Sequence, residues 1–318
     1  MNISLAVQVY NGGVYWQQCW ESILANIDFF DQIFISISKS PRQDDDVRLV
    51  KECSSSKIHL LVHDHHMTAV EHGKKLDLWL SSFGLKGHVF LLCHDDILLR
   101  EGLLQLKNLE LSQSEAVLGP WTFFSEDNGK LPLTVKQFRQ GNGDAISRQK
   151  FGFLVDQQFY AINISGVVIP ASIFNKRKFP WHLCSYGSRS EYLHLCNPEI
   201  KFIHQPPVPA VKIRRHGNSE GALMTELDNQ FDTVLYLNLA FEVYGEEETR
   251  RFTIQSLSYM LRKSPLRGLQ ALLVTQLRLL KCKFLTPGTA VRIWYALVCS
   301  SAEKIYNRIS GKIKRNVE

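Results

Sequence analysis

The stretch ISLAVQVYNGGVYWQQCWESILAN, residues 3–26, changes its pattern twice within a short length. Ile3–Val9 is apolar nearly throughout, which is typical of a strand covered on both faces. Tyr10–Gly13 has the composition of a turn. In Trp16–Asn26 the large apolar residues recur at helical spacing. The stretch therefore predicts a strand, a turn and a helix, which is the repeating unit of an α/β fold.

The segments that follow repeat this alternation. Alternating strands and helices predict a mostly parallel, doubly wound sheet with helices on its faces. Residues 125–152, rich in Gly, Asn, Gln and Asp, are interpreted as a long surface excursion. The predicted strands are Gln32–Ser38, Ile58–Val62, a strand from Val89, Ala116–Phe124, Phe159–Ile169 and Lys201–Ile203, and the predicted helix between them is Thr68–Ser82.

The pattern becomes helical after Gly221. We expect a domain boundary there, with an α/β catalytic domain over 1–221 and a basic helical region over 222–318. The predicted C-terminal helices are Thr225–Tyr244, Glu246–Arg262, Leu266–Lys281 and Pro287–Ile309.

The composition is that of a soluble globular protein. Of 318 residues, 45% are hydrophobic and 21% are charged. Seven scattered cysteines without a CxxC pair favour reduced thiols in the cytoplasm. Met1 and Asn2 lead straight into the first apolar run, so we expect no secretion signal. The late apolar run Leu269–Leu280 is interrupted by polar residues, so we expect no transmembrane helix.

The net charge of +6 is unevenly distributed. From Thr249 to the end there are fourteen Lys and Arg but only two Glu, so this segment carries +12 and the rest −6. A basic helical segment on an acidic body suits an anionic membrane surface, such as the inner face of the cytoplasmic membrane. A solvated helical extension is the alternative. Nucleic acid is not predicted as a partner, because no recognition motif accompanies the charge.

The stretch VFLLCHDDILL, residues 89–99, places two adjacent acids after a predicted buried strand. Ligands of open parallel sheets bind beyond the carboxyl ends of the strands. Adjacent carboxylates repel each other unless a cation lies between them and a ligand. Mg²⁺ and Mn²⁺ are held by carboxylates together with phosphate oxygens. Asp95 and Asp96 are therefore candidate metal ligands; alternatively one caps the following helix and the other faces water.

Five segments, in order, resemble family 2 glycosyltransferases. Residues 3–26 are similar to the opening of that family, and VFLLCHDDILLREGL, residues 89–103, resembles its metal-binding strand. ISGVVIPASIF, residues 164–174, resembles the acceptor-side segment. SYGSRSEYLHLC, residues 185–196, matches the region of its Glu-Asp-Tyr-type motif, and VKIRRHGNSEG, residues 211–221, resembles the closing loop.

The resemblance implies a GT-A fold and an inverting glycosyltransferase that uses a nucleotide-diphosphate sugar and Mg²⁺ or Mn²⁺. It assigns Glu191 as the general base that activates an acceptor hydroxyl. The further implied site residues are Tyr10, Asn11, Ser38, Asp95 and Ser219 for the donor, Asp95, Asp96 and His216 for the metal, and Gly166 for the acceptor. By its charge, Arg214 is a further candidate for the donor diphosphate, with a solvated strand end as the alternative. By their rings, Trp121 and Trp181 are candidates for the acceptor, with packing in the core or in a loop as the alternative. The implied acceptor is a lipid-linked glycan in surface polysaccharide or O-antigen synthesis.

Three positions depart from the family pattern. The second strand ends in Ser36–Ser40 rather than an acidic run, and Asp44–Asp46 follows a few residues later. Cys93 or His94 stands at the first acidic position of the metal motif, so Asp95 has to contribute most. Glu191 replaces the usual Asp. These departures keep a second hypothesis open, a non-catalytic or partner-binding member of the same fold.

The histidine-rich stretch at residues 63–66, with His72 nearby, has two interpretations. A zinc site is one, but no further matched ligand set follows it in the sequence. A polar rim at the end of the third strand is the interpretation we favour.

Overall fold

The computed structural model describes residues 2–119, 121–125, 145–147, 164–175, 199–215, 265–281 and 285–299, and the single positions 234, 238, 257, 258 and 261. The chain forms two compact units, which are described separately. The first contains every element from β1 to β11, and the second contains the C-terminal helices.

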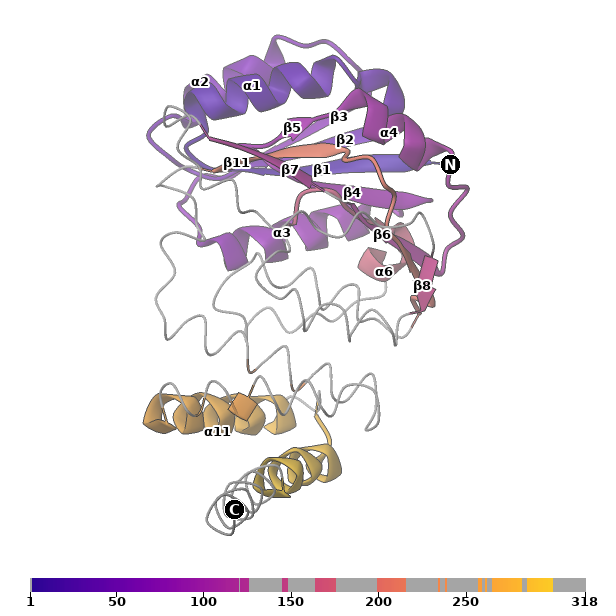
Figure 1. The fold of residues 1–318 in the computed structure, drawn as a ribbon. Coiled ribbons are helices and arrows are strands. Elements are labelled where there is room, and N and C mark those ends of the chain that lie inside the picture. Colours follow the sequence, from indigo (N-terminus) through magenta and orange to yellow (C-terminus); the bar gives the residue numbers. More distant parts are fainter. Residues whose placement is uncertain are drawn as a thin grey trace, which may run out of the picture. The chain divides into compact units, whose positions relative to one another are not determined.

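Four parallel strands form one half of the main sheet (Figure 1). They are β1 (Ile3–Val9), β2 (Gln32–Ile37), β3 (Ile58–Val62) and β4 (His88–Cys93), in the order β3-β2-β1-β4. Val9 pairs with Ile37, Ile37 with Val62 and Gln8 with Cys93. The carboxyl ends of all four strands therefore meet at one edge of the sheet.

The other half of the main sheet has mixed directions. Strand β9 (Val167–Pro170) runs antiparallel to both β4 and β6 (Glu115–Leu118). Strand β10 (Phe202–His204) is parallel to β6 and antiparallel to β8 (Ala145–Ser147). Within the described residues the sheet has the order β3-β2-β1-β4-β9-β6-β10-β8.

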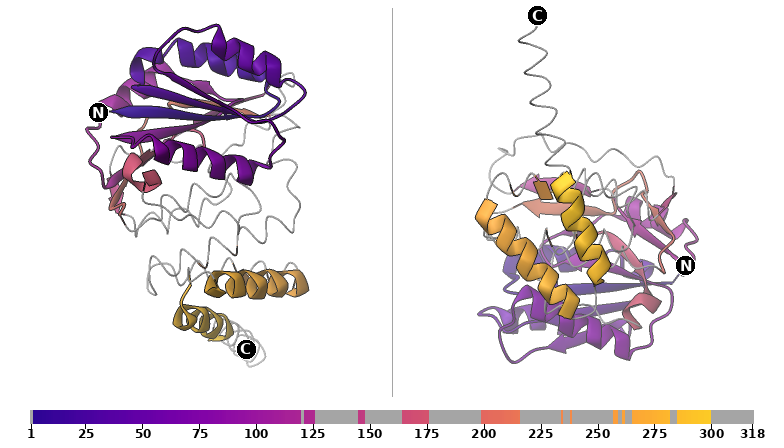
Figure 2. Two further views of the ribbon diagram at one scale, coloured as in Figure 1. Left: turned by 180° about the vertical axis from the view of Figure 1, so that it is seen from behind. Right: turned by 90° about the horizontal axis from the view of Figure 1, so that it is seen from below.

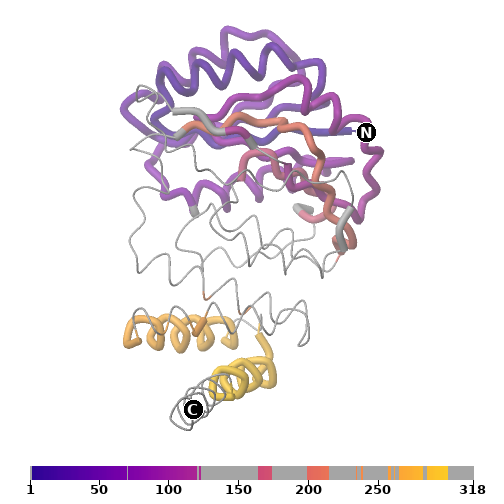
Figure 3. The backbone as a smooth tube through the Cα atoms, viewed as in Figure 1, coloured from indigo at the N-terminus to yellow at the C-terminus, as the bar shows by residue number. Residues whose placement is uncertain are grey.

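A second, three-stranded sheet connects distant parts of the first unit. Strand β11 (Val211–Arg215) lies between β5 (Ile97–Leu98) and β7 (Trp121–Ser125). The backbone trace in Figure 3 shows this late segment returning alongside the N-terminal half of the unit. The pairing places Arg214 near the end of β4, which decides the geometry of the site.

Helices cover both faces of the parallel half. Helix α1 (Gly13–Leu24) and α2 (Gln43–Lys51) lie on one face, and α3 (Ala69–Ser82) lies on the other (Figure 1). Helix α1 buries a stripe containing Trp16, Trp20 and Ile23. The remaining described helices of this unit are η1 (Ile27–Phe29), α4 (Arg100–Lys107) and α6 (Ala171–Asn175). The predicted Rossmann-like α/β fold with C-terminal helices is confirmed.

The second unit contains α11 (Pro265–Lys281) and a helix over 287–299. A buried polar chain joins them: Gln276 Nε2 donates to Asn238 Oδ1 at 2.7 Å, and Trp294 Nε1 donates to Gln276 Oε1 at 2.8 Å. The two views of Figure 2 show α11 and the following helix next to each other.

Two sequence predictions about elements need correction. The predicted strand Ala116–Phe124 is two strands, β6 and β7, which belong to different sheets. Strand β6 ends at Leu118, and the N–H of the next residue, Gly119, donates to Gly166 O at 3.3 Å beside the last pair of β6 and β9. Residues 125–152, expected to be an excursion, contain β8. The predicted helices over 225–262 lie mostly outside the described residues.

Candidate functional site

The turn between β1 and α1 is held by a buried carboxylate from α2. Asp46 Oδ2 accepts a hydrogen bond from Gly12 N and Oδ1 accepts one from Gly13 N, each at 3.1 Å. Its carbonyl accepts a third from Trp16 Nε1 at 3.2 Å. Burial raises the pKa of Asp46, and the hydrogen bonds from the two backbone N–H groups oppose that shift. Asp46 therefore fixes the backbone at the end of β1, a role for the acidic run that its position in the sequence did not reveal.

The turn also needs unusual backbone angles. Gly13 has φ +53° and Asn11 has φ +51°, a region in which Gly and Asn are favoured. Together with Asp46, these angles set the direction in which Tyr10 and Asn11 leave the sheet edge.

The predicted donor residues at this edge differ in accessibility. Tyr10 is 42% exposed, and its ring lies 5.1 Å from the ring of His66 at an angle of 45°. Asn11 is exposed. Ser38 is fully buried: its N–H donates to Val9 O at 3.0 Å, and its Oγ accepts from Met67 N at 3.2 Å. Ser38 therefore ties the end of β2 to the end of β1 and to the loop after β3.

Asp96 is a buried carboxylate with a partner for each oxygen. It is 1% exposed; Ser165 Oγ donates to Oδ2 at 2.5 Å, and Arg214 N donates to Oδ1 at 2.8 Å. Burial and the neighbouring Asp95 raise the pKa of Asp96 to about 7, against the lowering effect of Ser165 and Arg214. Neither aspartate caps the next helix, because α4 begins after Leu99 without a side-chain cap.

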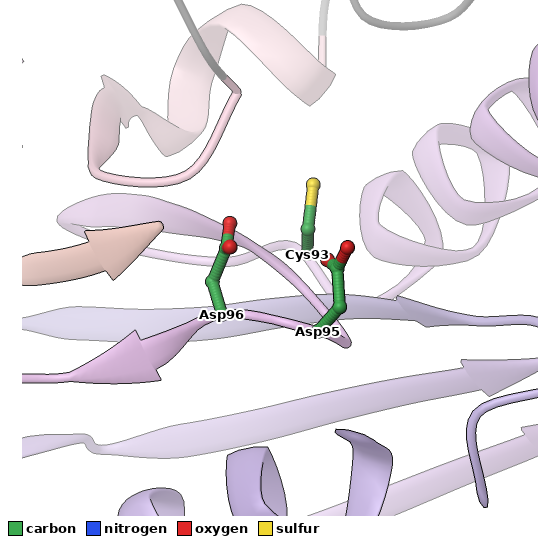
Figure 4. A group of neighbouring side chains, drawn as sticks. All are labelled: Cys93, Asp95 and Asp96. Atoms are coloured by element: carbon green, nitrogen blue, oxygen red, sulfur yellow. The ribbon is translucent and has the colours of Figure 1, made fainter. Parts of the chain in front are cut away.

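Asp95 is half-buried and stands beside Asp96 at the end of β4. One ligand atom each from Cys93, Asp95 and Asp96 lies within 4.8 Å of the others, and their side chains project from the same short segment (Figure 4). Among the described residues, this is the one such group of three or more ligand-type side chains. Two carboxylates suit a hard cation such as Mg²⁺ or Mn²⁺, whereas the thiol does not. Burial and the charge of Asp95 raise the pKa of Asp96, and a bound cation would offset both by favouring the charged form, so the two acids fit such an ion.

Arg214 is buried next to the acid pair. Its Nε donates to Asp95 O at 2.9 Å, its Nη2 donates to Gln18 Oε1, and its guanidinium lies over the Tyr15 ring, 4.6 Å from the ring centre. Burial lowers the pKa of Arg214 from its ordinary value. Arg214 therefore brings both a fixed cation and a backbone donor to the end of β4.

A buried hydrogen-bonded cluster lies behind the strand ends. Ser36 Oγ is 2.9 Å from Nε2 of His63 and 2.9 Å from Nε2 of His72. A hydroxyl has one proton, so it can donate to only one of the two rings, and at least one ring donates to it. Burial lowers the pKa of His63, and it lowers that of His72 to about 3. These two histidines are part of the core, and the exposed rim consists of His65 and His66.

The acceptor-side prediction at Gly166 falls on a buried turn. Gly166 has φ +87°, its N–H donates to Leu91 O at 3.0 Å, and its carbonyl accepts from Gly119 N. Its neighbour Ser165 is the residue that the sequence prediction missed: it accepts from Cys93 N at 2.8 Å and donates to Asp96. The sequence prediction includes residues 164–166 but assigns the acceptor-side role to Gly166, and no local pattern indicates that Ser165 bonds Asp96.

Several predicted residues lie outside the described part of the chain. Glu191, Trp181, His216 and Ser219 are in this group, and Trp121 is described only as a backbone position in β7. The structure thus places Tyr10, Asn11, Asp95 and Asp96 at the same edge of the sheet, with Arg214 bonded to the two aspartates. Gln18, Tyr15, Asp46 and Ser165 support them; Gln18, Tyr15 and Ser165 lie in segments that resemble the family, but none of the four was singled out as a site residue by the sequence.

No family model matches the sequence, and no curated protein matches it. The fold is nevertheless similar to solved structures of residues 1–349 of TarS from S. aureus. The match to the complex with UDP-GlcNAc has a TM-score of 0.59 at 13% identity and covers 84% of this chain and 75% of the solved TarS chain. The complex with UDP has a TM-score of 0.55 at 14% identity, with 84% and 74% covered. The predicted GT-A-type fold is therefore confirmed.

Proposed function

We propose that the chain is a glycosyltransferase that moves a sugar from a nucleoside-diphosphate donor to a hydroxyl group of a glycan. The observation that carries this proposal is the Asp95–Asp96 pair, placed at the carboxyl edge of a parallel sheet beside the end of β1. The similarity in fold to TarS, which was solved with UDP-GlcNAc and with UDP, supports a nucleotide-sugar donor.

The proposed metal is Mg²⁺ or Mn²⁺. Asp95 would provide the main carboxylate, with Asp96 behind it and His216 as a further ligand. When bound, the ion would supply positive charge to the departing diphosphate. Arg214 adds a second positive charge, and its hydrogen bonds to Asp95 O and Gln18 hold that charge in place. Ser219 is proposed as a further diphosphate contact.

The edge formed by Tyr10 and Asn11 is the proposed place of the nucleoside. The Tyr10 ring is exposed and stands beside the His66 ring, so the two present an aromatic surface on which a base can stack. Ser38 supports this edge indirectly, because its buried Oγ and N–H bond the neighbouring strand ends to each other.

Glu191 is the proposed general base. It would take the proton of the acceptor hydroxyl as that oxygen attacks the anomeric carbon and the diphosphate leaves. One base and no protein nucleophile give a single displacement, and hence inversion.

Gly166, Trp121 and Trp181 are proposed for the acceptor side. We infer that this side receives a lipid-linked glycan in surface polysaccharide or O-antigen synthesis. The enzyme would then act in the cytoplasm at the inner membrane face. No helix in the described part of the chain is long and apolar enough to cross a membrane.

Calorimetry with a panel of nucleoside diphosphates, with and without Mn²⁺, tests the proposal. We expect UDP or another nucleoside diphosphate to bind more tightly when Mn²⁺ is present, and Asp95→Asn to remove that difference.

The second candidate is a non-catalytic member of the fold. It is favoured by the end of the second strand, where Ser36 and Ser38 are buried structural residues in place of nucleotide-binding acids. Absence of binding at millimolar nucleotide would favour this candidate.

A further inference from the structure

Helix α11 exposes four of its leucines and buries two polar residues among apolar ones. Leu266, Leu269, Leu273 and Leu277 are spaced three or four residues apart, so they lie on one face, and Leu266 and Leu277 are 84% and 64% exposed. The opposite, buried face contains Thr275 and Gln276 together with the apolar residues Ala271, Leu272 and Leu279. The exposed face of a surface helix in a globular protein is normally charged or polar, so the exposed leucines are the unusual feature.

Hydrogen bonds fix this orientation. Gln276 is 3% exposed, and its amide both donates to Asn238 and accepts from the Trp294 indole. Rotating α11 to bury its four exposed leucines would break both hydrogen bonds of the buried Gln276 amide, at a cost of about 1–3 kcal/mol for each buried polar group left without its partner, and would expose Leu272 and Leu279. The leucine face is thus a stable feature of the second unit.

The neighbouring helix over 287–299 also exposes large apolar side chains. Val291, Tyr295 and Val298 are spaced four and three residues apart and are 67%, 65% and 64% exposed, while Ile293 and Leu297 are buried. Seven of the fourteen large apolar side chains that are exposed in the described part of the chain lie on these two helices. Water alone does not favour such a concentration of exposed apolar side chains.

The charges beside these stripes have one sign. Residues 265–281 and 285–299 contain no Asp or Glu, whereas Arg267, Arg278, Lys281 and Arg292 are exposed there. They belong to the C-terminal segment with fourteen basic and two acidic residues. A second copy of the chain would bring +12 against +12, so self-association through this face is opposed by charge repulsion.

We propose that the exposed faces of α11 and the helix over 287–299 dock on an anionic phospholipid surface. The apolar stripes enter the boundary between headgroups and acyl chains, and the four basic side chains contact lipid phosphates. Because the argument uses only the second unit, it is independent of the proposed activity of the first.

Flotation of the full chain with vesicles tests the proposal. We expect the chain to float with phosphatidylcholine–phosphatidylglycerol vesicles, and far less with phosphatidylcholine alone or in high salt. The triple variant Leu269→Gln/Leu273→Gln/Leu277→Gln should lower binding at least about tenfold. Arg267→Gln, Arg278→Gln and Lys281→Gln should each lower it about fivefold.

The matched control is Leu78→Gln with Leu104→Gln, which changes exposed leucines of α3 and α4 and should float like the wild type. Equal melting temperatures establish that the variants are folded; if the triple variant unfolds, Leu277→Gln alone is compared. The proposal is overturned if the leucine variants float unchanged or if neutral vesicles bind equally well. It is also overturned if the chain floats with neither vesicle and sedimentation shows an oligomer that the leucine variants dissociate, which would assign the face to a second copy.

Discussion

Asp95 and Asp96 are neighbours in sequence with different surroundings. Asp96 is buried and accepts one hydrogen bond on each oxygen, whereas Asp95 is half-buried at the open end of β4. Asp96 therefore ties together the segments that form the site, and Asp95 presents a charge to whatever binds there.

This difference predicts different effects of alanine substitution. Asp96→Ala leaves the Ser165 hydroxyl and the Arg214 amide without an acceptor, so we expect a loss of about 2–4 kcal/mol in the free energy of unfolding. Asp95→Ala should cost less than about 1 kcal/mol but abolish the effect of Mn²⁺ on nucleotide binding. Urea unfolding and calorimetry of both variants measure the two effects; equal losses of stability would contradict the distinction.

Glu191 provides a prediction about turnover. Glu191→Gln keeps the size of the side chain and removes its basicity, so we expect donor binding to persist while kcat falls about 10²–10⁴-fold, the usual contribution of a general base. Product formation and nucleotide affinity are measured on the same preparation. Turnover close to that of the wild type would exclude Glu191 as the base.

At the scale of elements, the β1–α1 turn depends on a residue of α2. Asp46→Ala removes both buried acceptors of the Gly12 and Gly13 amides, so we expect a loss of about 2–4 kcal/mol in stability and weaker nucleotide binding at the displaced Tyr10–Asn11 edge. The control is Asp45→Ala, whose exposed side chain pairs only at the surface with Arg48 and should change stability by less than about 0.5 kcal/mol. Thermal unfolding of the two variants compares them; matching melting temperatures would show that the turn does not need Asp46.

The contact between β2, β3 and α3 gives a pH dependence. His72 has a folded-state pKa of about 3 against about 6.5 when unfolded, so the unfolded chain binds more protons between these values and stability is lost as pH falls. In His72→Gln this loss is absent. The stability advantage of the wild type should therefore shrink by up to about 1.4 kcal/mol per unit as pH falls from 6.5 to 4. Urea unfolding at several pH values measures it, and a constant difference would contradict the burial of a neutral His72.

For the molecule as a whole, the sequence predicted what depends on local pattern. Strands β1 and β3 were predicted with their observed bounds, because each is one apolar run between turn residues. Helix α2 was not predicted: its buried positions include Gln43 and Asp46, so it lacks an apolar stripe. The break between β6 and β7 was missed because it is set by contact of Gly119 with Gly166, far along the chain.

The site was predicted to the same extent and for the same reason. The acids at the end of β4 follow from an apolar strand that ends in charge. Their division of roles does not, because Ser165 and Arg214 are 69 and 118 residues away from Asp96. Local pattern contains no information about partners at such separations; these partners are decided by the pairing of β9 with β4 and of β11 with β5.

The same separation sets an order of events during synthesis. Asp96 leaves the ribosome long before Arg214, so the growing chain holds a carboxylate destined for burial while one of its two donors is still unmade. Until residue 214 has been added, water must occupy the place of that backbone amide, and the end of β4 remains open. The edge that we propose for catalysis is consequently completed late in translation, after the parallel strands that support it, and a nascent chain cut short before β11 would have the sheet without a finished site.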